Sequence, residues 1–301
     1  MQGVCINMSI VNNYAYLVLN SGYCNTKVIT QGKKALYETK AIEQEETDGK
    51  TLVTADGRSF AIGDGLRDLT KKQDNEVQLL CSEYAILKYA ASRDINIVTT
   101  MPANMFLNKE YRLQFQNSYI GVHRGWVDGI YKEVEVHNCK VVMEGAAAYI
   151  AHKQQFNNNT VGILDIGGNT INLMIYQKDH VLKDTIATLD LGTIKLSREL
   201  IDKINIAKGW NVQDYELQEI LQEGSCNAIV EKEITGFVKR IKQALQEKRW
   251  NIERIPIFAT GGGALLLEQE LIQQFNNIKV SKTGLWDNAI GLNIIGGQLA
   301  W

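Results

Sequence analysis

The stretch that decides the fold is Val161-Gly-Ile-Leu-Asp-Ile-Gly-Gly-Asn-Thr-Ile-Asn-Leu-Met-Ile-Tyr176. It begins and ends with apolar runs, 161–164 and 171–176, which predict two buried strands. Residues 165–170 between them have the aspartate, glycine and asparagine typical of tight turns. The stretch therefore predicts a strand, a turn and a second strand.

The turn has the chemistry to hold an anion and a metal ion. Gly167 and Gly168 permit positive φ angles and remove side chains, so backbone N–H groups can approach an oxyanion. Asp165, at the end of a buried strand, can hold a hydrated Mg²⁺ or orient an attacking water. Thr170 adds a hydroxyl donor. An ordinary hairpin turn has the same composition and stays the alternative for this segment alone.

The same layout occurs earlier in the chain. The apolar run Tyr16–Leu19 predicts a strand, Asn20-Ser-Gly-Tyr-Cys-Asn-Thr-Lys27 a turn, and residues 28–30 a second strand. Lys27 can supply positive charge to phosphate oxygens, although a surface lysine after a turn is the alternative. Two related halves that face each other would place both turns at one cleft.

A third glycine-bearing segment follows the predicted strand 255–258. Gly261, Gly262 and Gly263 lie between this strand and a helix expected from near Leu265. Three successive glycines are costly in chain entropy, so we expect a ligand to approach the backbone here, such as a nucleotide across a helix N-terminus. A tight turn with close helix–strand packing is the alternative. The run is not GxGxxG, so it gives little support to a dinucleotide site.

Composition narrows the class of protein. The chain has 301 residues, of which 45% are hydrophobic, with two prolines and a net charge of −2. These values predict one large or two medium globular domains, and they do not indicate nucleic-acid or membrane binding. The cysteines lack CxxC spacing, and the four histidines lack metal-ligand spacing. With neither a leader nor an apolar membrane segment in the sequence, we expect a cytoplasmic protein.

The remaining segments give a coarse pattern of helices, strands and turns. We expect a short extension over 1–13, hairpins within 31–75 with a turn at Asp56-Gly57, helices over 76–92, 104–119 and 194–250, strands over 95–98 and 130–136, and a helix with a small-residue face from Glu144, broken at 157–160.

The turn at 20–27, the turn at 165–170 and the glycine-bearing segment at 261–263 follow one another in the chain. In this order they resemble the first phosphate motif, the second phosphate motif and the adenosine motif of the actin, heat-shock chaperone and sugar-kinase superfamily. Residues 165–172 and 261–264 are similar in particular to the bacterial ParM-type plasmid-segregation actins. The resemblance covers the chain from about residue 16 onward. It implies an α/β, actin-like ATPase fold with two related α/β domains and a nucleotide cleft between them.

The resemblance also implies how the chain is divided. Domain I is expected over 1–159, with a small subdomain at 31–75 and a C-terminal helix at 285–301 packing back on it. Domain II is expected over 160–284. The stretches 142–149 and 287–296 resemble the helices that connect the two domains.

Roles follow from positions that match the family pattern. Glu144 matches the glutamate that positions the hydrolytic water, Asp165 the aspartate linked to Mg²⁺ through water, and Lys27 a phosphate-contacting lysine. Without the resemblance, Glu144 would be interpreted as a carboxylate at a helix N-terminus. Asn20 departs from the pattern because the family has aspartate there; we expect weaker metal or nucleotide binding, or slower hydrolysis. The expected sites are catalytic Glu144 and Asp165; nucleotide-binding Ser21, Gly22, Asn25, Lys27, Gly167, Gly168, Asn169, Thr170, Gly192, Gly261, Gly262 and Gly263; and metal-binding Asp165 and Asn20.

The resemblance implies an ATPase that binds ATP (or GTP) with Mg²⁺, polymerises head to tail, and segregates plasmid DNA through a DNA-bound adaptor protein. Direct DNA contact and membrane binding are not expected. Two alternatives stay open. A small-molecule kinase of the same fold would need a substrate base for which no motif stands out. A slowly hydrolysing, nucleotide-dependent scaffold is compatible with Asn20.

Overall fold

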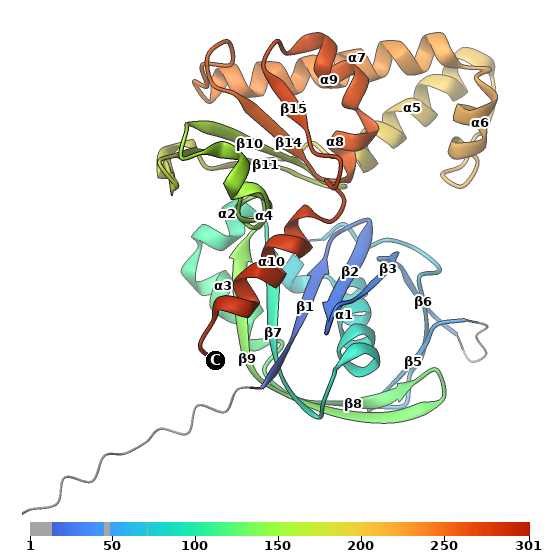
Figure 1. Cartoon of the computed structure of the whole chain (residues 1–301). Coiled ribbons are helices and arrows are strands. Elements are labelled where there is room, and N and C mark those ends of the chain that lie inside the picture. Colours follow the sequence, from blue (N-terminus) through green and yellow to red (C-terminus); the bar gives the residue numbers. More distant parts are fainter. Residues whose placement is uncertain (1–13, 45–48, 71) are drawn as a thin grey trace, which may run out of the picture.

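The computed structural model describes residues 14–44, 49–70 and 72–301. The expected extension over 1–13 lies outside these residues. Figure 1 shows two sheets, one above the other, with helices on their faces and with α10 (Asp287–Gln298) beside the place where the sheets meet.

The first sheet contains nine strands within the described residues, in the order β3-β2-β1-β7-β9-β8-β5-β6-β4. The hairpin of β5 and β6 confirms the turn predicted at Asp56-Gly57. The strands are β1 Ala15–Ser21, β2 Asn25–Thr30, β3 Lys33–Glu38, β4 Ala41–Glu43, β5 Thr51–Thr54, β6 Ser59–Ile62, β7 Asp94–Met101, β8 Gly121–Val127 and β9 Ile130–Met143.

The second sheet has the order β12-β11-β10-β14-β15, and β13 also pairs with β11. Its central hairpin is the stretch that predicted the fold. The strands are β10 Val161–Ile166, β11 Ile171–Gln177, β12 His180–Val181, β13 Ala187–Leu189, β14 Ile257–Thr260 and β15 Ile278–Val280.

The cores of the two sheets are built alike. In the first, β1 pairs antiparallel with β2 and parallel with β7, which runs parallel to β9. In the second, β10 pairs antiparallel with β11 and parallel with β14, which runs parallel to β15. Asn20 faces Lys27 across the first hairpin, and Asp165 faces Asn172 across the second, both seven positions apart (27 − 20 and 172 − 165). The predicted likeness of the two halves is therefore present in the strand pairing.

Successive side chains of the central strand β1 point to opposite faces of the first sheet, and different helices pack on the two faces. Leu17 and Leu19 point into a core shared with α1 (Glu76–Tyr89), whereas Val18 packs with α4 (Ala146–Phe156) and α10. Side chains two apart lie on one face of a strand, so both faces of the first sheet are covered. The other helices are α2 Ala103–Leu107, α3 Lys109–Asn117, α5 Thr193–Lys208, α6 Leu217–Glu223, α7 Asn227–Glu247, α8 Gly262–Leu266 and α9 Glu268–Gln274, with 3₁₀ turns at Lys72–Asp74 and Lys183–Thr185.

Two predicted helix starts are wrong. The helix expected from Glu144 begins at Ala146, because β9 stays paired with β7 as far as Met143 and Gly145 then takes a φ of 78°. Glu144 therefore lies in the turn between strand and helix. The helix expected near Leu265 begins at Gly262, inside the glycine run.

The path of the chain gives a physical basis for the expected division. β10 opens the second sheet at Val161, and α10 returns to contact β1 and β7. The limits 1–159 with 285–301, and 160–284, stay a prediction. Among helices of the described residues, none is both long and apolar enough to cross a bilayer.

Candidate functional site

A cavity of about 380 Å³ lies where the two hairpin turns face each other. The loop between β14 and α8 closes a third side. The volume lies within the range of small-molecule and cofactor pockets, roughly 300–1,000 Å³. Most of the site residues expected from the sequence line it: Asn20, Gly22, Asn25, Lys27, Glu144, Asp165, Gly167, Gly168, Asn169, Thr170, Gly261, Gly262 and Gly263.

Two expected nucleotide-binding residues, Ser21 and Gly192, are not among the lining residues. Ser21 is fully buried, and its hydroxyl lies 3.2 Å from Oγ1 of Thr26. Oγ1 of Thr26 is in turn 2.9 Å from Oγ1 of Thr39. The Ser21 side chain therefore stabilises the first hairpin and is turned away from the cavity.

Gly192 lies beneath the second turn. An added Cβ atom on Gly192 would be 2.1 Å from the carbonyl oxygen of Gly168, so the position admits only glycine without a shift of the backbone. This contact lets α5 approach the turn, where the backbone N–H of Thr193 donates to the Gly167 carbonyl (3.2 Å). Thr193 lines the cavity in place of Gly192.

Asp165 is a buried carboxyl group at the centre of the site. Burial, and next the negative charge of Glu144, raise its pKa to about 7, although a hydrogen bond from Asn288 and the charge of Lys27 oppose the rise. Nδ2 of Asn288 donates to Oδ2 of Asp165 (2.9 Å), and Oδ1 of Asn288 accepts from the backbone N–H of Gly145 (3.0 Å). A nearby divalent cation would favour the ionised form of such a carboxyl group. Asp165 is therefore suited to bind a cation through water.

Lys27 reaches the same cavity from β2. Burial, as the largest effect, lowers the pKa of its ammonium group. Its Nζ lies 3.4 Å from the carbonyl oxygen of Asn25. A phosphate in the cavity would replace the lost hydration of this cation with a charge-assisted contact.

Glu144 is held by two side chains that the sequence did not single out. Nζ of Lys72 lies 3.1 Å from Oε1 of Glu144, and Nδ2 of Asn172 donates to Oε2 (3.0 Å). Asn172 has a signal in the sequence, because it occupies the position across the hairpin that Lys27 occupies in the first turn. Lys72 lies in a charged stretch with no motif, so no pattern pointed to it.

Asn20 takes the position in the first hairpin that Asp165 takes in the second. It is buried, and its Nδ2 donates to Oγ1 of Thr100 (2.6 Å). An aspartate in its ionised form can only accept hydrogen bonds, so this donation depends on the amide. The neutral amide of Asn20 is thus paired with the Thr100 hydroxyl.

Close packing accounts for part of the glycine run. An added Cβ atom would lie 2.2 Å from the Ile166 carbonyl oxygen at Gly261, and 2.4 Å from Cγ2 of Ile166 at Gly263. The alternative of close helix–strand packing therefore holds for these two glycines, although both also line the cavity. Beside the run, Leu265, Leu266 and Leu285 form an apolar wall that the sequence did not reveal. Such a wall suits a ring or base more than a phosphate.

The remaining residues of the first turn add one hydroxyl and one thiol. Burial, followed by the charge of Glu144, raises the pKa of Tyr23 to about 12, so its hydroxyl stays protonated at neutral pH. Burial also raises the pKa of Cys24. Because the thiolate is the reactive form of cysteine, this environment disfavours nucleophilic chemistry at Cys24.

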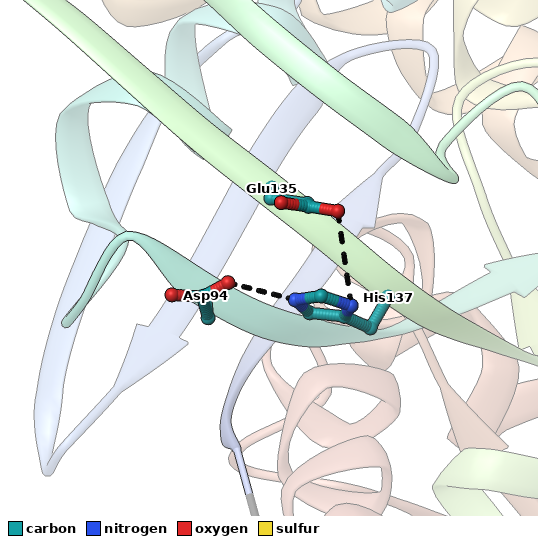
Figure 2. Close-up of side chains that lie close together, drawn as sticks. All are labelled: Asp94, Glu135 and His137. Carbon is teal, nitrogen blue, oxygen red and sulfur yellow. Dashed lines mark hydrogen bonds and ion pairs between the residues drawn. The ribbon is translucent and has the colours of Figure 1, made fainter.

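One histidine lies near two carboxylates at the other end of β7 (Figure 2). Nε2 of His137 is 2.8 Å from Oδ1 of Asp94, and Nδ1 is 4.0 Å from Oε1 of Glu135. The two ring nitrogens face different carboxylates, whereas a metal ion needs ligand atoms that converge in front of one nitrogen. The cluster is therefore arranged as one hydrogen bond and one longer polar contact around the ring, although the spacing of the histidines in the sequence gave no sign of it.

Comparisons with known proteins agree with the fold. A family model described as actin like proteins N terminal domain matches residues 20–146. A comparison of the sequence with curated proteins gave no match.

Three solved structures illustrate the likeness. Ta0583, an archaeal actin homolog, has a TM-score of 0.80 and 16% identity, covering 95% of this chain and 100% of its own. It has also been solved in complex with ADP. A non-polymerisable mutant of the pCBH ParM has a TM-score of 0.79 and 17% identity, covering 95% and 100%. The filament structure of AlfA from a B. subtilis plasmid has a TM-score of 0.65 and 17% identity, covering 93% and 98%.

The chain therefore has the actin-like fold, and the predicted resemblance to actin-like proteins is confirmed in the fold and, over residues 20–146, in the sequence.

Proposed function

We propose that this actin-like chain binds a nucleoside triphosphate, ATP or GTP, together with Mg²⁺ in the cavity between its two sheets. The observation that carries the proposal is the matched pair of hairpin turns, with cross-strand pairs Asn20–Lys27 and Asp165–Asn172, facing one cavity. Glycines in each turn let backbone groups approach phosphate oxygens. Leu265 and Leu266 offer an apolar wall for the base.

The polar residues have complementary roles in this proposal. Lys27 contacts the outer phosphates, and Asp165 holds Mg²⁺ through water, with Asn20 beside it as a neutral second group. The ion would offset the negative charge of the phosphate oxygens. Glu144 orients the attacking water, because its carboxylate lines the cavity and keeps lone pairs beyond the two that Lys72 and Asn172 occupy.

We further propose that nucleotide binding controls assembly into filaments. A nucleotide that contacts both sheets stabilises the arrangement in which they are close, so binding and closure are thermodynamically linked. Head-to-tail contacts that do not close into a ring give open filaments. The similar AlfA structure is a filament, and the similar ParM was made non-polymerisable by mutation. By analogy, the filament would act in the bacterial cytoplasm and segregate plasmid DNA through an adaptor protein.

Three measurements test the proposal in sequence. Calorimetry with ATP, GTP and ADP, with and without Mg²⁺, reports binding. Phosphate release is then compared for wild type, Glu144→Gln and the exposed control Glu223→Gln on α6. Electron microscopy with each nucleotide reports assembly.

The expected result is Mg²⁺-dependent binding, with phosphate release about 100-fold slower in Glu144→Gln and unchanged in Glu223→Gln. Equal rates in wild type and Glu144→Gln would remove Glu144 from the mechanism. Absence of polymers at every concentration and nucleotide would refute assembly and leave binding intact. Transfer of phosphate to an added metabolite would favour the kinase alternative.

A further inference from the structure

Lys72 is a buried cation beside the cavity. Its side chain is 1% exposed, and it lies in the short 3₁₀ turn Lys72–Asp74 that precedes α1. Nζ donates to the carbonyl oxygen of Thr100 (2.8 Å) and to Oε1 of Glu144 (3.1 Å). The ring of Phe115 lies on another side, with its centroid 5.8 Å from Nζ. The ammonium group therefore has a carbonyl, a carboxylate and an aromatic face as neighbours in place of bulk water.

A contribution to folding stability is a weak explanation for the burial of the Lys72 ammonium group. Removing an ammonium group from water is costly, and a buried ion pair can often be replaced by apolar residues of similar volume without loss of stability. A methionine, for instance, has nearly the same length and would pack against Phe115 without the cost of desolvation. The position of the charge, directly beside the cavity, points instead to a role in the chemistry.

The contacts of Glu144 define that role. Lys72 approaches Oε1 from the segment before α1, on the side of the first sheet, and Asn172 approaches Oε2 from β11 in the second sheet. Each oxygen thus has one fixed donor, and the carboxylate plane is set by both. Because an ionised carboxylate has about four acceptor sites, lone pairs remain for a water in the cavity.

Lys72 is also connected to the first turn. The carbonyl oxygen of Thr100 accepts a hydrogen bond from Lys72, and Oγ1 of Thr100 accepts one from Asn20. The end of β7 thereby fixes the ammonium group and the first-turn amide relative to each other. Because one acceptor of the Lys72 ammonium group is a main-chain carbonyl, Nζ is held more firmly than it would be by the Glu144 side chain alone.

We propose that Lys72 is a positioning residue for hydrolysis, which holds the Glu144 carboxylate in the orientation that aligns the attacking water. The inference rests on the proposed function, because it assigns Lys72 a role through Glu144. A misoriented carboxylate would leave ground-state nucleotide binding almost unchanged and would slow the chemical step.

A double-mutant cycle on the full chain tests this role. The variants are Lys72→Met, Glu144→Gln and the combination, with Lys132→Met as a control at an exposed lysine on β9. We measure ATP affinity by calorimetry, single-turnover phosphate release, and the melting temperature. Lys72→Gln, which keeps a donor and loses the charge, provides a second variant if Lys72→Met does not fold.

In Lys72→Met we expect phosphate release to fall at least about tenfold while ATP affinity changes by less than about threefold. In the Glu144→Gln background, the same substitution should change release by less than about twofold, because coupled residues are not additive. Lys72→Gln should release phosphate at an intermediate rate, and Lys132→Met at the wild-type rate.

Two results would overturn the inference and leave the proposed function standing. One is a Lys72→Met or Lys72→Gln protein that releases phosphate at the wild-type rate. The other is an equal slowing in both backgrounds, which would mean that Lys72 acts independently of Glu144. If the wild-type protein binds no nucleotide or releases no phosphate, the proposed function itself fails, and the role of Lys72 fails with it.

Discussion

The backbone of Gly291 in α10 lies directly against the carbonyl oxygen of Ala147 in α4. An added Cβ atom on Gly291 would be 1.7 Å from that oxygen, far inside any real contact. The two helices therefore cross almost backbone to backbone beside the place where the sheets meet (Figure 1). The small-residue face expected for α4 is the surface that α10 contacts.

Gly291→Ala should force the two helices apart. We expect a loss of about 2 kcal/mol or more in the free energy of unfolding, since overpacking costs roughly 1–3 kcal/mol even where side chains can adjust. Gly297→Ala in the same helix is the matched control, because a Cβ atom there meets only the Tyr16 hydroxyl at 3.5 Å. Chemical denaturation measures both. Equal stability of the two variants would show that the crossing is looser than described.

Asp165→Asn should stabilise the ligand-free protein at high pH. Because the folded pKa is about 7 and the ordinary value is 3.8, ionising Asp165 opposes folding, fully above pH 7 and progressively less down to about pH 4. We expect a gain of between about 1 and 4 kcal/mol at pH 8, which shrinks as the pH falls through this window. Denaturation at pH 8 and pH 5 measures it.

The same substitution should weaken binding of the Mg²⁺–nucleotide, because the amide has lost the charge that attracts the ion. Wild-type affinity should also fall as the pH drops below 7, where Asp165 takes up a proton. Calorimetry across this range checks both effects. A wild-type affinity that is independent of pH between 6 and 8 would contradict this role of Asp165.

Asn20→Asp should raise the apparent affinity of the site for Mg²⁺. An aspartate at this position can accept a hydrogen bond from the Thr100 hydroxyl, which replaces the present donation from Asn20 to Thr100. The added charge beside the expected ion should lower the Mg²⁺ concentration for half-maximal phosphate release about tenfold. A titration of Mg²⁺ at saturating ATP measures this. An unchanged midpoint would mean that residue 20 does not face the ion.

The ion pair of His123 and Glu83 should stabilise the fold at low pH. Burial by itself would lower the pKa of His123, but the hydrogen bond from the ring to the Glu83 carboxylate (2.6 Å) and its charge raise the pKa overall. Because the folded pKa is raised, this stability is complete below about pH 6.5 and is lost as the pH rises through the folded value. Glu83→Gln should cost about 1 kcal/mol at pH 6 and almost nothing at pH 9 by denaturation.

Much of the site could be predicted because its parts are contiguous in the chain. Asp165 to Thr170 carries strand ends, glycines and a carboxylate within six positions, so local rules identify both the turn and its chemistry. The turn beginning at Asn20 repeats that layout. The places of Ser21 and Gly192 could not be predicted in this way, because whether a residue faces the cavity or the interior depends on the packing behind the turn.

Contacts between side chains from distant segments had no signal in the sequence. Lys72 meets Glu144 across 72 positions, and Asn288 meets Asp165 across 123. A lysine in a charged stretch, or an asparagine at the start of an expected connecting helix, shows no sign of its partner until the fold brings it to the cavity. The start of α4 was also misjudged, because pairing of β9 with β7 outweighs the helix propensity of the residues after Met143.

The sequence by itself determined the two strand–turn–strand units, the glycine-bearing loop and the acidic and basic groups within them. These depend on periodicity and turn chemistry, which act over a few residues. The tertiary structure decided which of these groups share a cavity, how Glu144 and Asp165 are held, and where α4 and α10 cross. Burial and contact between segments far apart in the chain are properties of the folded packing, and they also set the pKa of Asp165.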